Sequence, residues 1–260
     1  MPRLAKPIVH LACVTDPGEV RSHNEDSVAG DAVIGFAVLA DGMGGHNAGE
    51  VASRIAVDVV NTMFRSAGFL GERLEPERAE GFVASATAAA NSAVLALAAT
   101  DRRYRGMGTT LVVVFWYHDT VTYGHVGDSR LYLLREGRLE RLTRDHTIVQ
   151  QQLEQGRITA EEVRYAANRN VLTRAVGIDA EVEADVHTRA TRPGDLYLLC
   201  SDGLTDMMTE DEIGRTLDAC KADVNTAAVR LVELANEAGG HDNVSVVVAR
   251  VLGGPHNAPA

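Results

Sequence analysis

The sequence is poor in aromatic residues, in cysteine and in basic residues. Phenylalanine, tryptophan and tyrosine make up 5% of the 260 residues, which argues against an aromatic platform for bases or sugars. The three cysteines are an odd number without short spacing, so they indicate neither a disulfide framework nor a zinc site. The net charge is −11, from 25 basic and 36 acidic residues, which is the reverse of the balance in a nucleic-acid-binding protein. Nucleic acid is therefore not an expected partner.

Long hydrophobic runs are also missing. The longest fully apolar run, Leu111–Tyr117, is far shorter than the roughly 20 residues that a membrane helix needs. The apolar stretch 8–14 is short and contains His10, so it lacks the pattern of a signal peptide. The proportions of hydrophobic residues (45%) and charged residues (23%) are typical of a globular chain. We therefore expect a soluble, monomeric, cytoplasmic protein that does not contact a membrane.

The apolar pattern predicts one domain that contains both strands and helices. Strand-forming runs bounded by turn residues predict strands over residues 9–14, 33–40, 109–117, 121–126, 131–135, 138–142, 181–190, 196–200 and 244–251. Apolar spacing and capping pairs predict helices over residues 47–65, 77–103, 209–220 and 223–238. Because short turns join the strands between residues 109 and 142, we expect these strands to form an antiparallel meander. We expect a single domain over residues 1–252, followed by a disordered tail over 253–260.

Residues 146–170 differ in character from the rest of the chain. They are polar and helical, and Thr159 and Glu162 have the spacing of a capping pair. No β-branched run interrupts them. We expect an insertion outside the main core, a flap over about residues 145–175, and we call these residues the flap segment.

Four aspartates occur in one kind of position. Three of them end predicted strands and the fourth precedes one, and each adjoins glycine or asparagine: Asp41, Asp128, Asp202 and Asp242. Because one antiparallel strand starts beside the end of its neighbour, four such residues can meet at one edge of the sheets. A single aspartate of this kind is readily explained as a turn residue, but four in the same context are not. Without a cation they would repel one another and raise one another's pKa values.

The types of ligand available indicate a hard divalent cation. Carboxylate oxygens favour Mg²⁺ or Mn²⁺, or Ca²⁺ in a looser site, and we expect no nearby set of cysteine and histidine ligands. The spaced acidic loop of an EF-hand is absent from the sequence. Two or more metals that share carboxylates can generate a hydroxide and hold phosphoryl oxygens. The residues alone therefore predict a metal-dependent hydrolase that acts on a phosphate ester.

Several short motifs follow one another in a recognisable order. They are RxxNED at residues 21–26, DGMGG at 41–45, GMGTT at 106–110, GDSR at 127–130, SDGL at 201–204 and DN at 242–243. With these motifs, residues 9–251 resemble the metal-dependent serine/threonine protein phosphatases of the 2C type, bacterial branch. The resemblance implies an α+β fold, a four-layer α-β-β-α sandwich in which helices flank two antiparallel sheets. It also implies hydrolysis of phosphoserine and phosphothreonine in proteins that a serine/threonine kinase phosphorylates.

The resemblance implies a set of metal ligands. Two or three Mn²⁺ or Mg²⁺ ions would be held by Glu25, Asp41, the Gly42 carbonyl, Asp128, Asp202 and Asp242. Asp41 would bridge two metals, and Asp202 and Asp242 would complete one of the two sites. Glu25 and Gly42 would hold the other metal, largely with waters. Asp128, together with Asp202, would bind a third metal.

The resemblance implies catalytic roles as well. Arg21 would bind the phosphate through its forked guanidinium, and Asp26 would orient a metal-bound water. A metal-bridging water or hydroxide would attack phosphorus without a covalent enzyme intermediate. Animal members of the family carry a histidine, a proposed proton donor, where this chain has Met43, and methionine cannot donate a proton. A metal-bound water or His46 would then protonate the leaving oxygen, although His46 could equally contact the substrate.

Two hypotheses from other functional classes compete with the phosphatase hypothesis. A non-catalytic phosphoprotein-binding module would be expected to have lost at least one of Asp41, Asp202 and Asp242, and all are present. A metal-dependent phosphodiesterase or nuclease on an unrelated fold is disfavoured by the acidic net charge and by the lack of a basic patch in the sequence.

Overall fold

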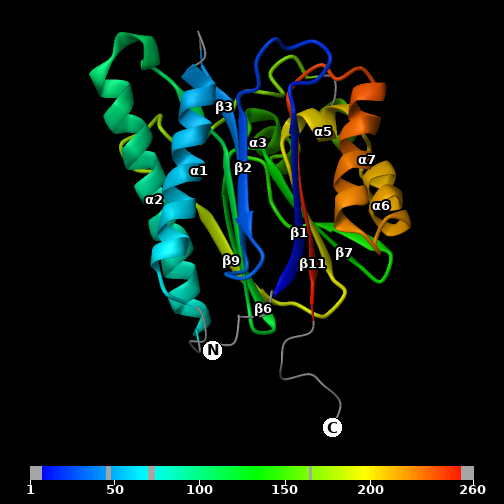
Figure 1. The fold of residues 1–260 in the computed structure, drawn as a ribbon. Coiled ribbons are helices and arrows are strands. Elements are labelled where there is room, and N and C mark those ends of the chain that lie inside the picture. The colour runs from blue at the N-terminus through cyan, green and yellow to red at the C-terminus, as the bar shows by residue number, and fades with distance from the viewer. Residues whose placement is uncertain (1–7, 45–47, 70–73, 164–165, 253–260) are drawn as a thin grey trace.

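Two antiparallel sheets pack face to face in the computed structural model, and helices cover both outer surfaces (Figure 1). The structure describes residues 8–44, 48–69, 74–163 and 166–252. This α-β-β-α sandwich confirms the fold class that the resemblance implies.

Each sheet combines strands from distant parts of the chain. The first sheet contains, in spatial order, β1 (Val9–Asp16), β11 (Val244–Val251), β10 (Leu196–Cys200), β7 (Arg130–Arg135) and β8 (Arg138–Arg141). The second contains β2 (Asp26–Asp31), β3 (Phe36–Met43), β5 (Leu111–Tyr117), β6 (Thr120–Val126) and β9 (Asp185–Ala190), and β4 (Gly108–Thr109) pairs with the end of β3. Alternate residues of the facing strands form the core between the sheets. There Trp116 meets Tyr197 edge-on, with the ring centroids 5.6 Å apart.

The helices bury one face each. α1 (Ala48–Ser66) and α2 (Pro76–Thr100) cover the second sheet, and a 3-10 turn (Arg102–Tyr104) follows α2. α5 (Asp202–Met207), α6 (Glu210–Ala219) and α7 (Val224–Glu237) cover the first sheet. Residues Pro76–Ala98 of α2 are long and apolar enough to span a membrane. However, the face of α2 that contains Val83 and Val94 is fully buried in the core of the second sheet, as in a core helix.

The structure corrects three expectations about the elements. The strand predicted at 33–40 is the second half of a hairpin, β2–β3, whose turn contains Gly35 at φ +83°. The sequence did not indicate β2 because this edge strand is half-buried and polar at both ends. The predicted meander is interrupted, because the chain leaves the second sheet after β6 and enters the first at β7. The short helix α5 was not predicted at all.

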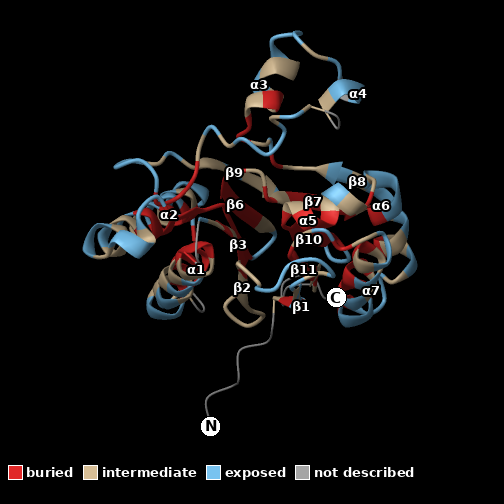
Figure 2. Cartoon of the chain, turned by 90° about the horizontal axis from the view of Figure 1, so that it is seen from above, coloured by how far each residue is buried: buried red, intermediate tan, exposed pale blue. Residues whose placement is uncertain are grey.

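The flap segment contains α3 (Ile148–Glu154) and α4 (Ala160–Val163), which stand clear of the sandwich (Figure 2). The predicted capping pair is confirmed, since the Thr159 backbone N–H donates to Glu162 Oε2 at 2.7 Å. The base of the segment is closed by a bridge between Thr147 and Leu172. The predicted tail, 253–260, and His46 lie outside the described residues.

Candidate metal centre

The predicted aspartates meet at one edge of the two sheets. Asp41 lies near the end of β3, Asp128 in the crossover between the sheets, Asp202 at the start of α5 and Asp242 just before β11. Burial, and then the negative charges of Asp26, Asp202, Asp128 and Asp242, raise the pKa of Asp41 well above its usual range. Antiparallel pairing therefore brings together the carboxylates that the sequence placed at strand ends.

The other carboxylates share this environment. Burial followed by nearby acidic charge raises the pKa of Asp202 to about 6 and that of Asp128 to about 8. Burial also raises the pKa of Asp26 to about 7, although Ser201 donates a hydrogen bond to Asp26 Oδ2 at 2.8 Å. The second oxygen, Asp26 Oδ1, is buried without a hydrogen-bond partner among the described residues. An all-oxygen set with excess negative charge and an unused buried acceptor fits hard divalent cations and their waters.

The GMGTT motif fixes the backbone of Asp41. Thr110 Oγ1 accepts from the Asp41 N–H at 2.9 Å, and the Thr110 N–H donates to the Asp41 carbonyl at 2.8 Å. Thr109 Oγ1 donates to the same carbonyl at 2.8 Å. The Thr110 and Ser129 hydroxyls lie 2.7 Å apart, which connects Asp41 to the loop of Asp128. The sequence singled out this motif but did not reveal its positioning role.

Gly42 lies where β3, α1 and the Glu25 segment pack backbone against backbone. A Cβ on Gly42 would lie 2.1 Å from the Gly49 carbonyl oxygen and 2.6 Å from that of Glu25. The Gly42 N–H donates to the Glu25 carbonyl at 3.1 Å. This close approach keeps the Glu25 side chain next to Gly49 and beside the end of β3. Asn47, the first residue of the helix predicted over 47–65, lies outside the described residues.

Arg21 lies at the rim of the site. Its guanidinium donates to Asp242 Oδ2 at 2.8 Å, and the Arg21 side chain is 55% exposed.

The loop between β1 and β2 is held by Asn243, whose Oδ1 accepts from the Glu25 N–H at 2.8 Å. Asn243 Nδ2 donates to the carbonyls of Pro17 and His23. The sequence showed Asn243 only as part of a motif, and its role in shaping the loop appears in the structure alone.

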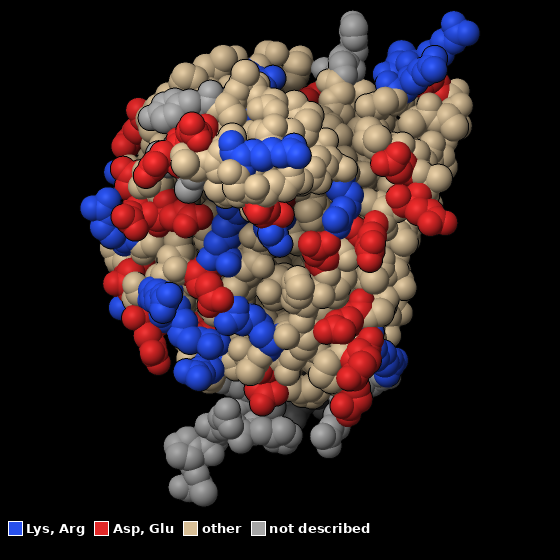
Figure 3. Space-filling model, turned by 180° about the vertical axis from the view of Figure 1, so that it is seen from behind, with Lys and Arg blue, Asp and Glu red and all other residues tan. Residues whose placement is uncertain are grey.

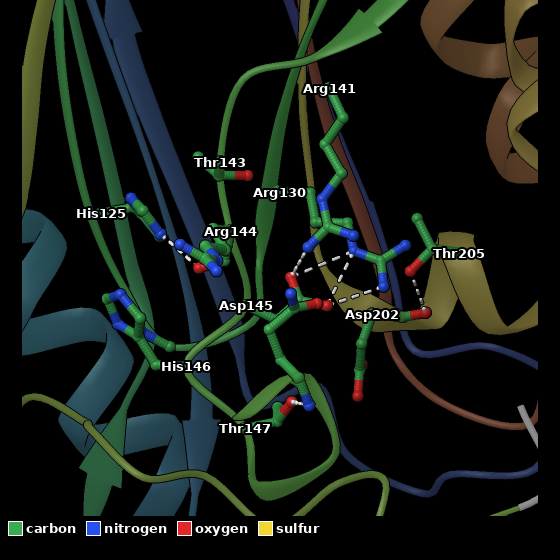
Figure 4. A network of polar contacts seen from close by, with 12 residues as sticks. His125, Arg130, Arg141, Thr143, Arg144, Asp145, His146, Thr147, Asp202 and Thr205 are labelled. Atoms are coloured by element: carbon green, nitrogen blue, oxygen red, sulfur yellow. Dashed lines mark hydrogen bonds and ion pairs between the residues drawn. The ribbon is translucent and has the colours of Figure 1, made fainter. Parts of the chain in front are cut away.

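A largely buried ion network follows the Asp128 loop, and Figure 4 shows Arg130, Arg141 and Asp145 pointing toward one another. Asp145 accepts from Arg130 at 2.8 Å and also pairs with Arg141. The neighbouring residue, His146, contacts Gly127 twice: its N–H donates to the Gly127 carbonyl at 2.9 Å, and its Nδ1 accepts from the Gly127 N–H at 3.1 Å. The start of the flap segment thus contacts the chain on both sides of Asp128. Sequence reasoning missed this arrangement.

A second group of ligand-type atoms also appears. His125, His146 and Asp185 offer atoms that lie within 4.8 Å of one another, which corrects the expectation that no nearby histidine set exists. His146 uses both ring nitrogens, since Nδ1 accepts from the Gly127 N–H and Nε2 lies 3.3 Å from Asp185. A neutral imidazole has one N–H and one ring nitrogen with a lone pair. Because Nδ1 accepts from the Gly127 N–H, the proton of His146 is on Nε2. A metal could bind Nε2 only if this proton left the ring or moved to Nδ1, which would break the hydrogen bond with Gly127. Hydrogen bonding explains this group better than a metal does.

The comparisons with known proteins agree with this geometry. A family model described as protein phosphatase 2C matches residues 19–235. The serine/threonine protein phosphatase PstP of Mycobacterium tuberculosis is 40% identical over 247 residues, which cover 94% of this chain and 45% of PstP. This chain thus spans less than half the length of that relative. A serine/threonine phosphatase, Stp, of Listeria monocytogenes is 35% identical over 243 residues, or 92% of this chain and 95% of Stp.

Solved structures extend the similarity to three dimensions. The crystal structure of M. tuberculosis PstP has a TM-score of 0.85 and 40% identity, and covers 94% of this chain and 99% of that one. The catalytic domain of PstP in complex with two manganese ions has a TM-score of 0.84 and 39% identity, over 95% of this chain and 100% of that one. Together with the clustered aspartates, these matches show that the chain belongs to the protein phosphatase 2C family.

Proposed function

We propose that this protein is a metal-dependent phosphatase of phosphoserine and phosphothreonine in proteins. The observation that carries the proposal is the convergence of Asp41, Asp128, Asp202 and Asp242 on one site whose acidic charge needs cations. Two or three Mn²⁺ or Mg²⁺ ions would be held by these aspartates, Glu25 and the Gly42 carbonyl. When bound, the ions activate water and neutralise phosphoryl charge. The two manganese ions in the PstP catalytic domain support this assignment.

The side chains of this chain would bind the phosphate and orient the attacking water. The exposed Arg21 guanidinium can turn from Asp242 to two phosphoryl oxygens, which its fork matches. Ser201 fixes one oxygen of Asp26, which leaves Oδ1 to accept a hydrogen bond from the water. Met43 cannot supply the proton for the leaving oxygen, so that proton comes from a solvent molecule or from His46.

The cellular setting follows from the same assignment. We infer phosphorylated proteins as substrates, and a serine/threonine kinase as the enzyme that supplies them. The acidic net charge and the interspersed basic and acidic side chains on the face shown in Figure 3 support an action on proteins and not on nucleic acid. We further propose a cytoplasmic monomer in which residues 1–252 form one catalytic domain, with the flap segment as an insertion outside its main core.

The first test is hydrolysis of a phosphothreonine peptide with Mn²⁺, Mg²⁺, Ca²⁺ or EDTA. We expect activity with Mn²⁺ or Mg²⁺ that EDTA abolishes. Asp202→Ala should lower kcat/KM by at least about 100-fold, because each lost metal contact removes several kcal/mol of transition-state stabilisation. Calorimetric titration with Mn²⁺ should show weaker binding by the same variant. Asp218→Ala, which removes an aspartate on the outer helix α6, is the matched control.

Two outcomes would favour one of the two competing functions over the proposed phosphatase. If the folded protein hydrolyses nothing with any cation, the non-catalytic phosphoprotein-binding module becomes the better account. Hydrolysis of a dinucleotide ester but not of the phosphopeptide would instead favour the phosphodiesterase.

A further inference from the structure

Two apolar side chains meet beside the metal centre. Met43 follows Asp41 by two positions in β3, so both side chains project from the same face of the strand. The strand partner of Met43 is Gly108, which has no side chain. A Cβ on Gly108 would lie 2.8 Å from Met43 Cε and 2.9 Å from Ile178 Cδ1. Met43 and Ile178 therefore converge over Gly108, and we call the surface they form the Met43–Ile178 shelf.

The loop that carries Ile178 is firmly held. Asn91, a buried residue of α2, accepts from the Gly177 N–H at 2.6 Å and donates to the Asp179 carbonyl at 3.0 Å. Just before the loop, the backbones of Val176 and Thr109 exchange two hydrogen bonds of 2.9 Å. Ile178 is nevertheless 45% exposed. The fold thus holds the backbone on both sides of Ile178, and the apolar side chain of this residue remains partly exposed to water.

We propose that the Met43–Ile178 shelf binds an apolar side chain of the phosphoprotein substrate, close in sequence to the phosphorylated residue. This inference rests on the proposed phosphatase function and adds a substrate preference to it. Two features favour an apolar partner: the shelf consists of two apolar side chains, of which Ile178 is 45% exposed, and it adjoins the strand end that carries Asp41. Contact with an apolar side chain would remove the exposed part of Ile178 from water.

Strand geometry limits which substrate residue reaches the shelf. Residues in an extended chain advance about 3.3 Å each, so Met43 lies about 7 Å along β3 from Asp41. An extended substrate with its phosphate at Asp41 would place a side chain two or three positions away over the shelf. The preference should therefore occur near the phosphoresidue and fade with distance from it.

The experiment compares phosphothreonine peptides in the Mn²⁺-loaded protein. One peptide has alanine at every flanking position, and the others carry a single leucine placed in turn at each position up to three residues before and after. We expect one of these leucines to raise kcat/KM by about 3- to 10-fold, through a lower KM, as partial burial of a leucine side chain would give. Ile178→Ser should bring the leucine-to-alanine ratio to about 1, whereas Ile178→Val should retain most of it.

Val229→Ser is the matched control, because Val229 on the outer helix α7 is also 45% exposed. This variant should keep the leucine preference. The proposal is overturned if no leucine position helps the wild type, or if Ile178→Ser lowers kcat/KM equally for every peptide. A wild-type protein that hydrolyses none of the peptides and no p-nitrophenyl phosphate would refute the phosphatase function itself, and the shelf proposal with it. Hydrolysis without a leucine preference would refute the shelf alone.

Discussion

Gly42 shows how one missing side chain permits the close packing of backbone at the candidate metal centre. Its Cα faces the carbonyls of Gly49 and Glu25, and these three backbones could not approach if position 42 carried a Cβ. In the sequence, the glycine next to Asp41 suggested a turn, and the resemblance implied that the Gly42 carbonyl binds a metal. The physical requirement is different, because Gly42 is paired within β3 and its absent side chain lets α1 and Glu25 pack against the strand.

We therefore predict that Gly42→Ala destabilises the protein strongly and weakens Mn²⁺ binding. The added Cβ would lie 2.1 Å from a backbone oxygen, so backbone must move, at a cost of about 3 kcal/mol or more by analogy with severe overpacking. Urea unfolding and calorimetric Mn²⁺ titration measure the two effects.

The control for this substitution is Gly81→Ala in α2. A Cβ on Gly81 would meet nothing within 4 Å, so we expect a gain of about 0.5–1 kcal/mol from the better helix residue. Equal stability of the two alanine variants would contradict the packing argument.

At the scale of elements, the segment between β8 and α3 braces the crossover between the sheets. Asp145 pairs with Arg130 of β7 and with Arg141 of β8, and all three side chains are largely buried. Next to it, His146 holds Gly127. Because these contacts surround Asp128, they hold a carboxylate that we propose as a metal ligand in a stretch that belongs to neither sheet.

We predict that Asp145→Asn destabilises the protein by about 3–5 kcal/mol, because it leaves two largely buried arginines without their carboxylate. Denaturant unfolding of the metal-free protein measures the loss. Glu154→Gln is the control, since it weakens the pair between Glu154 and the exposed Arg144, and should cost less than about 1 kcal/mol. A loss for Asp145→Asn no larger than that of the control would show that the network does not support the fold.

At the scale of the whole molecule, the acidic cluster makes the metal-free protein sensitive to pH. The pKa of Asp26 is raised to about 7 and that of Asp128 to about 8, both chiefly by burial. The folded protein therefore keeps protons that the unfolded chain has lost above about pH 4. Stability from these groups is full at low pH and falls as pH rises through the folded pKa values. His125, whose pKa burial lowers to about 4, acts in the opposite direction only below about pH 6.5.

We predict that the melting temperature in EDTA falls between about pH 6.5 and 8.5, the range set by the raised pKa values. Mn²⁺ should stabilise the protein more at the upper end of this pH range, because the carboxylates have then lost their protons and the cations neutralise their charge. Differential scanning calorimetry with and without Mn²⁺ measures both trends. Asp128→Asn should reduce the fall, and a metal-free melting temperature that is constant or rises over this range would contradict the prediction.

The sequence by itself determined the features that depend on neighbouring residues. Strand-forming runs, capping pairs and turn residues placed most elements to within a few residues. They also placed Asp41, Asp128, Asp202 and Asp242 at strand ends. These signals are local, because periodicity and turn chemistry act over a few positions. The motif order then sufficed to indicate the family, which the comparisons confirmed.

Only the tertiary structure decided what depends on contacts between distant residues. Asn243 holds Glu25 across 218 positions, Ile178 meets Met43 over Gly108, and His146 holds Gly127 at the crossover between the sheets. No local pattern specifies such partners, because they follow from which strands pair and where the chain changes sheets. The edge strand β2 was missed for the same reason, since its pairing with β3 outweighs its polar composition.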